Sequence, residues 1–353
     1  MIAVLHALAT ANPRRYATQQ EVFRFLEAHF SMEQAEHDLY REILLDGPIH
    51  GRYIAVDDDE QICSNDPDQN IERFLKYGRQ MGSQAARNAM RQAQLQPADV
   101  GGIVVNTCTG YLCPGLSSYL AEDLGLRSLT SVLDIAGMGC GAAIPNLECA
   151  SRLAMSAGDR AILSIAVEVC SATFFMGKEP DLVVSNSIFG DGASAAVLTA
   201  QDDASSKGLM RLLDFESGVF PEYRDHLRYR SQGGRLRNVL HRNIPVIGAR
   251  TTAQITRRLL SRHALTLKDI DWWAVHPGGT SVLERIQKEL GLASDQLRFS
   301  YEVFQQYGNM SSPSVMFVLD KIVREGKPTR HQRGLLLSFG AGFTAFAAFV
   351  EFL

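Results

Sequence analysis

One short pattern occurs twice in the chain, as FGDGASA at residues 189–195 and as FGAGFTA at residues 339–345. The copies share a phenylalanine, two glycines, a hydroxyl side chain and a final alanine at matching positions. Each copy leads into an apolar run that is typical of a buried strand, at 196–199 and 346–352. This recurrence favours an α/β fold built from two similar halves.

A second echo supports the duplication. Residues 84–105 predict a helix, a connector that carries Asp99 and then a strand. Residues 253–275 predict the same series, with Asp269 in the connector. Each copy then continues through a loop into a helix that ends in Leu-Gly-Leu, at 124–126 and 290–292.

A third echo pairs Gly139-Cys140 with Gly308-Asn309. We expect each pair to lie between a β-rich stretch and a helix. Because the three echoes follow one order, they predict an N-terminal half over residues 1–200 and a C-terminal half over residues 201–353.

Strands that alternate with helices predict mostly parallel sheets covered on both faces. The apolar runs at 131–136 and 161–167 are expected to be central strands. Two segments have no counterpart in the other half and are expected to set substrate specificity. They are residues 14–80, predicted to be helical at 18–30 and 32–45, and the arginine-rich residues 201–244.

The composition is that of a well-packed globular protein, with 46% hydrophobic and 21% charged residues. A net charge of -4 gives no general attraction to nucleic acid. The six cysteines form no C-x-x-C pair, so neither a zinc ribbon nor a thioredoxin-like redox motif is expected. No apolar stretch is long enough to span a membrane and the N-terminus lacks the basic lead of a signal peptide, so a cytoplasmic location is expected.

Cys140 is the candidate nucleophile. It follows a predicted strand and the turn Gly137-Met138-Gly139, and it precedes a predicted helix. Unpaired N–H groups and the dipole at a helix N-terminus stabilise a thiolate. The alternative is a buried structural cysteine, which is the interpretation favoured for Cys149 and Cys170.

His276 and Asn309 are its candidate partners. His276 ends a predicted strand and enters Pro277-Gly278-Gly279, at the strand end where α/β sheets bind ligands. A surface or capping histidine is the alternative. Asn309 is the duplicated counterpart of Cys140, although it could instead cap a helix. A histidine N–H and an asparagine amide can both donate to one enolate oxygen, which suits decarboxylation of a malonyl thioester better than hydrolysis.

Seven motifs in order make the chain similar to the type III polyketide synthases, the chalcone synthase-like group of thiolase-fold condensing enzymes. They are CTGYLCPG (108–115), GMGCGAA (137–143), VEVCSATF (167–174), IFGDGA (188–193), HPGG (276–279), GNMSS (308–312) and SFGAGFT (338–344). The resemblance covers nearly the whole length. It implies a duplicated, five-layered αβαβα homodimer that condenses acyl-CoA with malonyl-CoA, without a metal or other cofactor.

The resemblance also implies roles for individual residues. Cys140 matches the acylated nucleophile, and His276 and Asn309 match the decarboxylation pair. Phe189 matches a gatekeeping residue between the CoA tunnel and the cavity, and Asn238 falls at the second gate. The remaining pocket positions are Thr109, Thr173 and Ser311, together with Cys113, which matches a residue that crosses into the partner's cavity.

The basic CoA-binding residues of the family do not transfer. The hypothesis is that arginines within 224–242, or Arg41 and Arg52, contact the CoA phosphates. Three rival functions stay open: a single-condensation ketoacyl synthase III-type enzyme, a non-catalytic scaffold of the same fold, and a cysteine hydrolase.

Overall fold

The computed structural model describes residues 1–202 and 207–353. Within these residues, nine strands form one sheet in the order β11-β12-β13-β8-β1-β7-β6-β4-β5, and two small two-stranded sheets pair β2 with β3 and β9 with β10. The strands are β1 (Ile2–Ala11), β2 (Arg15–Thr18), β3 (Gly51–Ile54), β4 (Val100–Asn106), β5 (Ser131–Ile135), β6 (Ala161–Val169), β7 (Asp191–Gln201), β8 (Met210–Val219), β9 (Leu227–Gln232), β10 (Arg235–Leu240), β11 (Trp272–Val275), β12 (Arg333–Gly340) and β13 (Thr344–Phe352).

Helices cover both faces of the large sheet. The α-helices are α1 (Gln19–His29), α2 (Gln34–Leu45), α3 (Pro67–Gln92), α4 (Leu116–Asp123), α5 (Ala143–Ala154), α6 (Pro180–Ile188), α7 (Ile244–Arg262), α8 (Thr280–Leu290), α9 (Arg298–Tyr307) and α10 (Ser314–Lys321). Short 3₁₀ turns include η1 (Asp59–Cys63), η2 (Pro97–Asp99), η3 (Gly139–Gly141), η4 (Cys170–Thr173) and η7 (Leu267–Asp269).

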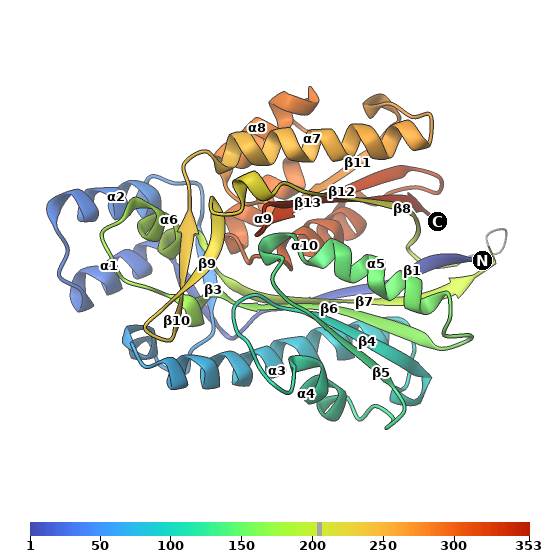
Figure 1. Ribbon diagram of the computed structural model, residues 1–353, viewed down its shortest axis with the longest axis horizontal. Coiled ribbons are helices and arrows are strands. Elements are labelled where there is room, and N and C mark those ends of the chain that lie inside the picture. The colour runs from blue at the N-terminus through green and yellow to red at the C-terminus, as the bar shows by residue number, and fades with distance from the viewer. Residues whose placement is uncertain (203–206) are drawn as a thin grey trace.

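The elements stack as helix, sheet, helix, sheet and helix layers (Figure 1). α7, with α8 beside it, covers the outer face of the β8, β11, β12 and β13 group, whereas α3 and α4 cover the outer face of the other strands. α5 and α10 lie between the two groups and contact strands of both. The predicted αβαβα layering is therefore confirmed.

The duplication extends to small details. In each half, the long outer helix (α3 or α7) is followed by one residue with positive φ, Gln94 or Ala264. A 3₁₀ turn, η2 or η7, then leads into a strand. The two aspartates of the echo occupy the same place, because Asp99 Oδ2 accepts from the N–H of Gln96 at 2.7 Å and Asp269 Oδ2 accepts from the N–H of Thr266 at 2.7 Å. These contacts cap the turns that aim β4 and β11 into the sheet.

The prediction of mostly parallel sheets was wrong. Parallel pairing occurs between β4 and β5, β4 and β6, and β11 and β12, whereas β7, β13, β1 and β8 pair antiparallel with their neighbours. β12 and β13 are joined by residues 341–343 alone, and a parallel pair needs a crossover of about a dozen residues or more. The short connection therefore forces an antiparallel hairpin.

The two apolar runs expected to be central strands differ in their positions. β6 lies between β7 and β4 and is buried along its whole length, as predicted. β5 is the edge strand of the sheet, and Val132 and Leu133 are 53% and 42% exposed, so the prediction for 131–136 was wrong. Apolar composition alone does not distinguish an interior strand from an exposed apolar edge.

The boundaries of the non-repeating segments also need correction. α1 and α2 form within a residue or two of their predicted limits, but the repeated helix α3 already begins at Pro67, inside the segment assigned to 14–80. Residues 201–244 contain β8, which pairs with β13 and belongs to the large sheet.

The stretch before Gly308 also differs from its prediction, because it is the helix α9, whereas a β-rich stretch was expected.

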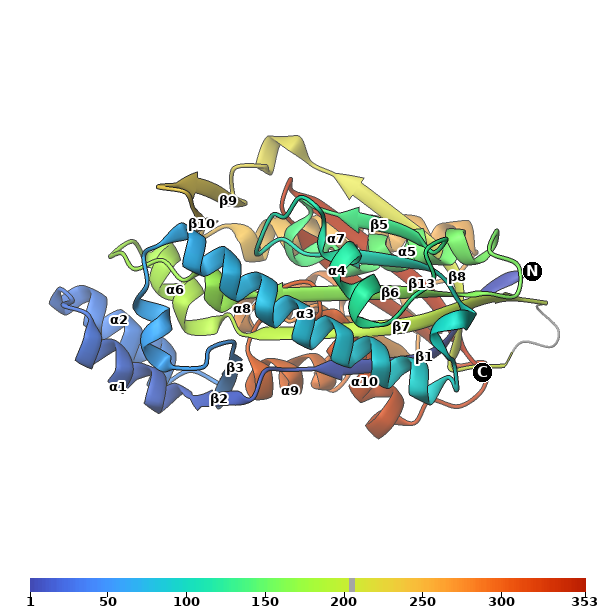
Figure 2. The same ribbon diagram turned by 90° about the horizontal axis from the view of Figure 1, so that it is seen from below.

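Three hydrophobic clusters fill the spaces between the layers. The central cluster joins the halves, with Ile144 of α5 and Phe317 of α10 packed between strands of both groups. One outer cluster lies under α3 and the other under α7. A fourth, smaller cluster holds α1 and α2 together at one end of the molecule, beside β2 and β3 (Figure 2).

Candidate active site

Cys140 lies in η3, directly before α5, in a turn that only small residues permit. Gly137 and Gly139 adopt positive φ values of 84° and 57°, which favour glycine. The backbone of Gly340 packs directly against this turn, since a Cβ at that position would lie 2.0 Å from the carbonyl oxygen of Met138. The second copy of the repeated pattern therefore supports the turn that holds the cysteine.

His276 follows β11 and is almost completely buried, with 1% of its surface exposed. Its backbone N–H donates to the carbonyl of Leu337 at 2.8 Å, which fixes it at the end of the parallel β11–β12 pair. The ring meets Phe339 edge to face with centroids 6.5 Å apart, and Nδ1 has no hydrogen-bond partner among the described residues. The packing thus fixes the position of the imidazole without occupying Nδ1.

A chain of short contacts runs from Cys140 toward His276. Ser311 Oγ donates to Cys140 Sγ at 3.3 Å, and the backbone N–H of Ser311 donates to Asn309 Oδ1 at 2.8 Å. Asn309 Nδ2 donates to the carbonyl of Gly278 at 3.3 Å. Gly278 adjoins the imidazole, because a Cβ there would lie 3.6 Å from His276 Nε2. The structure therefore brings the three residues singled out in the sequence to one place.

Burial favours the neutral forms of Cys140 and His276. Burial raises the pKa of Cys140 to about 12, with a smaller opposing effect from the hydrogen bond of Ser311. Burial also lowers the pKa of His276 to about 3. A neutral thiol and a neutral imidazole are therefore favoured in the unliganded protein, rather than an imidazolium–thiolate pair.

Glu168, a carboxyl group with no exposed surface, was not among the site residues predicted from the sequence. It accepts hydrogen bonds from the backbone N–H of Cys108 at 2.9 Å, from Thr109 Oγ1 at 2.9 Å and from Ser312 Oγ at 2.6 Å. Cys108 Sγ also lies 3.5 Å from Ser311 Oγ. The signal was available, since an acidic residue inside an otherwise apolar strand must find buried partners.

The pocket residues implied by the resemblance fall into three environments. Ser311 contacts Cys140 directly, and Thr109 is held between Glu168 and the backbone N–H of Val169. Phe189, Thr173 and Asn238 line a pocket described below. Cys113 is exposed, outside both groups.

Phe189 is tied to Asn309 through the backbone. The two residues form an isolated parallel bridge, in which the N–H of Asn309 donates to the carbonyl of Ile188 at 2.8 Å and the N–H of Gly190 donates to the carbonyl of Asn309 at 3.0 Å. Arg52 Nη1 donates to the carbonyls of Phe189 and Asn186, at 2.6 and 2.8 Å. A buried cation therefore positions the residue that matches the gate.

Two of the hypothesised CoA-binding arginines serve the protein interior instead. Arg52 is 3% exposed and donates to Phe189 and Asn186 as above, so the hypothesis was wrong for it. Arg237 is 7% exposed and lies 3.6 Å from both Glu179 and Asp181. Neither guanidinium is placed to meet a phosphate. Arg41, Arg230 and Arg242 are exposed.

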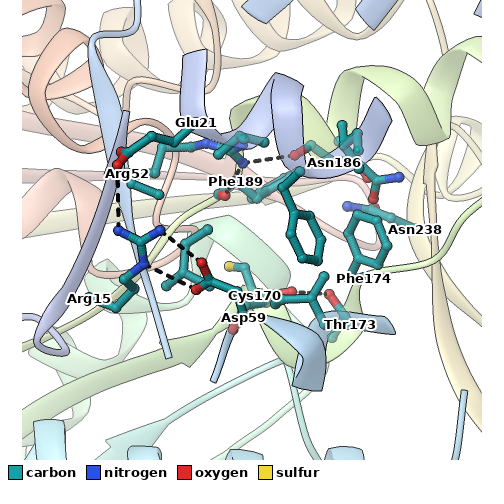
Figure 3. Close-up of a pocket in the computed structure, with 18 residues that line it drawn as sticks. Arg15, Glu21, Arg52, Asp59, Cys170, Thr173, Phe174, Asn186, Phe189 and Asn238 are labelled. Carbon is teal, nitrogen blue, oxygen red and sulfur yellow. Dashed lines mark hydrogen bonds and ion pairs between the residues drawn. The ribbon is translucent and has the colours of Figure 1, made fainter. Parts of the chain in front are cut away.

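The pocket beside Phe189 lies between α1, β3, η1, η4, α6 and β10 (Figure 3). The space between atoms in and around it is about 730 Å³, with adjoining open solvent included. Cys170 lines it, although this cysteine was interpreted as purely structural. Cys140, His276 and Asn309 do not line it, and Phe189 connects it to them through the bridge to Asn309.

Two family profiles match adjoining parts of the chain. The profile for FAE1/type III polyketide synthase-like protein matches residues 10–216, and the profile for the C-terminal domain of chalcone and stilbene synthases matches residues 218–351.

Among the described residues, no helix is both long and apolar enough to cross a membrane.

Individual proteins agree with the profiles. The chain is 32% identical to a 3,5-dihydroxyphenylacetyl-CoA synthase of Streptomyces toyocaensis, over 98% of this chain and 88% of the relative. It is 25% identical to an α-pyrone synthesis polyketide synthase-like protein of Mycobacterium tuberculosis, over 97% and 89%. The crystal structure of PKS-I from the brown alga Ectocarpus siliculosus superposes with a TM-score of 0.90 at 27% identity, covering 100% of this chain and 98% of that one.

These relatives are polyketide synthases, and they do not support the rival single-condensation enzyme. With the αβαβα layers, a half-buried cysteine at a glycine turn and matches that extend over residues 10–351, the chain belongs to the type III polyketide synthase family and is a condensing acyltransferase.

Proposed function

We propose that Cys140 carries the growing chain in a type III polyketide synthase that joins an acyl-CoA starter to malonyl-CoA units and closes the product to a pyrone, resorcinol or related ring. The observation that carries the proposal is the run of contacts from Cys140 Sγ through Ser311 and Asn309 to Gly278, beside His276. The relatives support the ring-forming outcome, since one is named for α-pyrone synthesis and another makes a dihydroxyphenyl product.

Loading begins with a neutral thiol, so its proton has to leave during attack on the thioester. His276 is the acceptor, because its neutral imidazole has an available nitrogen. The Cys140 sulfur forms a bond to the starter carbonyl carbon, the C–S bond to CoA breaks, and the proton passes through His276 to the departing CoA thiolate. The product of this step is an S-acyl cysteine and free CoA.

Extension then requires an enolate. Malonyl-CoA loses CO₂, and the electron pair of the broken C–C bond moves into the thioester as an enolate oxygen. The Asn309 amide and His276 stabilise that oxygen by hydrogen bonding. The enolate carbon attacks the acyl group on Cys140, the C–S bond to Cys140 breaks, and a chain longer by two carbons leaves on CoA before it is loaded again.

Two further features of the family are proposed for this chain. Exposed Arg230, in the β9–β10 hairpin that carries Asn238, and exposed Arg242, just after β10, bind CoA phosphates. The exposed edge of β5, with Val132 and Leu133, pairs with a second copy to form a homodimer, and Cys113 then reaches the partner's cavity.

All six cysteines are free thiols, which supports a cytoplasmic location.

Incubation with a panel of acyl-CoA starters and malonyl-CoA, followed by mass analysis of products, tests the proposal. Cyclised products with two or more extensions support it. A lone β-ketoacyl thioester as product would instead favour the single-condensation enzyme. Absence of any acyl increment on Cys140 would remove the cysteine from the mechanism, and the Cys140→Ser protein provides the blank for that mass measurement.

A further inference from the structure

The helix α6 ends at Ile188, immediately before the backbone bridge that joins Phe189 to Asn309. The last four carbonyl groups of a helix have no acceptor role inside it, so their hydrogen bonds must come from elsewhere. In α6 these are the carbonyls of residues 186–189, because the last bond within the helix runs from the N–H of Phe189 to the carbonyl of Ser185. The donors that reach these carbonyls therefore fix the end of α6 and the bridge that follows it.

Two side chains of the N-terminal segment, Arg52 of β3 and Gln19 of α1, bind three of these four carbonyls. Arg52 Nη1 donates to the carbonyls of Asn186 and Phe189, at 2.8 and 2.6 Å (Figure 3). Gln19 Nε2 donates to the carbonyl of Ser187 at 2.9 Å. Gln19 Oε1 also accepts from Arg52 Nε at 2.9 Å, so the two side chains act as one cap that binds α6 from outside.

The fourth carbonyl connects this cap to the candidate active site. It belongs to Ile188 and accepts from the backbone N–H of Asn309 at 2.8 Å. The stem of Arg52 packs beside the same contact, because a Cβ at Gly308 would lie 2.4 Å from the Ile188 oxygen and 3.0 Å from Cγ and Cδ of Arg52. The arginine thus touches both sides of the bridge: the end of α6 through its guanidinium, and the residue before Asn309 through its stem.

The charge of Arg52 suits this position. Burial lowers its pKa to about 10, so the guanidinium keeps its proton at neutral pH. A cation at the C-terminus of a helix is stabilised by the helix dipole. Arg52 and Gln19 are each 3% exposed, and hydrogen bonds from a charged donor are strong where water is excluded.

We infer that Arg52, supported by Gln19, is a positioning residue for the decarboxylation of malonyl-CoA: it holds the end of α6 and thereby the place of Asn309. The inference rests on the proposed function, in which the Asn309 amide stabilises the enolate oxygen. A shift of about 1 Å in a positioned group can lower a rate about a hundredfold. The N-terminal segment, expected to set specificity, therefore also serves the chemistry of the C-terminal half.

Two variants test the cap. Arg52→Lys keeps the charge and removes the planar fork, and Gln19→Leu keeps the approximate size and removes both hydrogen bonds. We expect each to lower the release of labelled CO₂ from malonyl-CoA by about tenfold or more. Acyl loading on Cys140 and the KM for malonyl-CoA should stay within about threefold of the parent, since the cap acts on Asn309. If Arg52→Lys does not fold, Gln19→Leu decides the question.

Arg237→Lys is the matched control. Arg237 is also buried and binds the same helix at its other end, 3.6 Å from both Glu179 and Asp181. This variant should release CO₂ at the rate of the parent. A loss equal to that of Arg52→Lys would assign the effect to anchoring of α6 in general and overturn the inference.

A double variant shows whether the cap acts through Asn309. In an Asn309→Ala protein, Gln19→Leu should lower the residual CO₂ release by less than about twofold, because the group that the cap positions is already gone. Losses that multiply in the double variant would indicate a general structural role and overturn the inference. Normal CO₂ release by Arg52→Lys and Gln19→Leu would overturn it and leave the proposed function standing, whereas a parent that releases no CO₂ would overturn both.

Discussion

Ser311 Oγ donates a hydrogen bond to Cys140 Sγ at 3.3 Å, although the two residues are 171 positions apart and come from opposite halves of the chain. The hydroxyl opposes the effect of burial, which by itself raises the pKa of the thiol. It is thus a local source of thiolate stabilisation in an otherwise unfavourable site.

Ser311→Ala is expected to slow alkylation of Cys140 by iodoacetamide by roughly tenfold to a hundredfold, because a hydrogen bond to a charged group contributes about 1.5–3 kcal/mol. The rate in the parent should still be rising well above neutral pH, since the pKa of Cys140 is raised to about 12. Peptide mapping follows Cys140 separately from exposed Cys113. Ser156→Ala, on an exposed turn, is the control. Equal Cys140 rates in parent and Ser311→Ala would show that the hydroxyl does not act on the thiolate.

Asn309→Ala is expected to lower decarboxylation of malonyl-CoA by roughly 10²–10³-fold, the effect of losing one oxyanion donor. Acyl loading on Cys140 should change far less, because the Asn309 side chain hydrogen-bonds to the backbone of Gly278 and Ser311. Release of labelled CO₂ reports the first quantity and intact protein mass the second. Normal CO₂ release, or equal damage to both steps, would contradict the separate role of Asn309.

His276 should make the protein less stable in acid. Burial lowers its pKa from 6.5 to about 3, so between these values the unfolded chain binds a proton that the native protein does not. Above pH 6.5 the neutral His276 costs no stability, because the unfolded chain is neutral at this position as well. As the pH falls from 6.5 toward 3, the free energy of unfolding declines by up to about 1.4 kcal/mol per pH unit. His276→Gln should therefore flatten the acid limb of urea-unfolding free energies, whereas His29→Gln, on an exposed turn of α1, should not. Parallel curves for His276→Gln and the parent would refute the shift.

Arg242→Glu is expected to raise the KM for malonyl-CoA about tenfold or more with little change in kcat, because it reverses a charge proposed to meet the phosphates. The exposed Arg250, on α7 and outside residues 224–242, provides the control as Arg250→Glu. Equal KM values for both variants and the parent would move the phosphate site elsewhere, with Arg230 and Arg41 the next positions to test.

Val132→Asp is expected to dissociate the proposed homodimer, because it places a charge on the exposed apolar edge strand β5. Val246, 42% exposed in the first turn of α7, is the control as Val246→Asp. Light scattering coupled to size exclusion gives the mass of each. A parent protein that runs as a monomer, or a Val132→Asp protein that remains dimeric, would count against β5 as the interface.

The sequence predicted well those features that depend on local pattern. The paired echoes predicted two similar halves, and glycine-rich turns before Cys140 and after His276 predicted the candidate site, since a sharp turn at a strand end has a strong local signature. Both stay predictions. Antiparallel pairing, the edge position of β5 and the helix before Gly308 were missed, because strand neighbours are chosen by long-range packing.

The charged residues divide in the same way. Arg52 and Arg237 looked like phosphate ligands in the sequence, and only the folded chain shows them buried against carbonyls and carboxylates. Glu168 likewise gains its meaning from donors that arrive from the 107–109 turn and from Ser312. A charge on a chain has no fixed role until its neighbours are known.

The sequence by itself determined the family, the layered fold and the position of the cysteine, because turns, strand periodicity and repeats are local and survive without coordinates. The tertiary structure decided what surrounds that cysteine: a hydroxyl from the other half and a neutral imidazole. Burial is the physical reason, since it sets the protonation of Cys140 and His276 and depends on every layer packed around them.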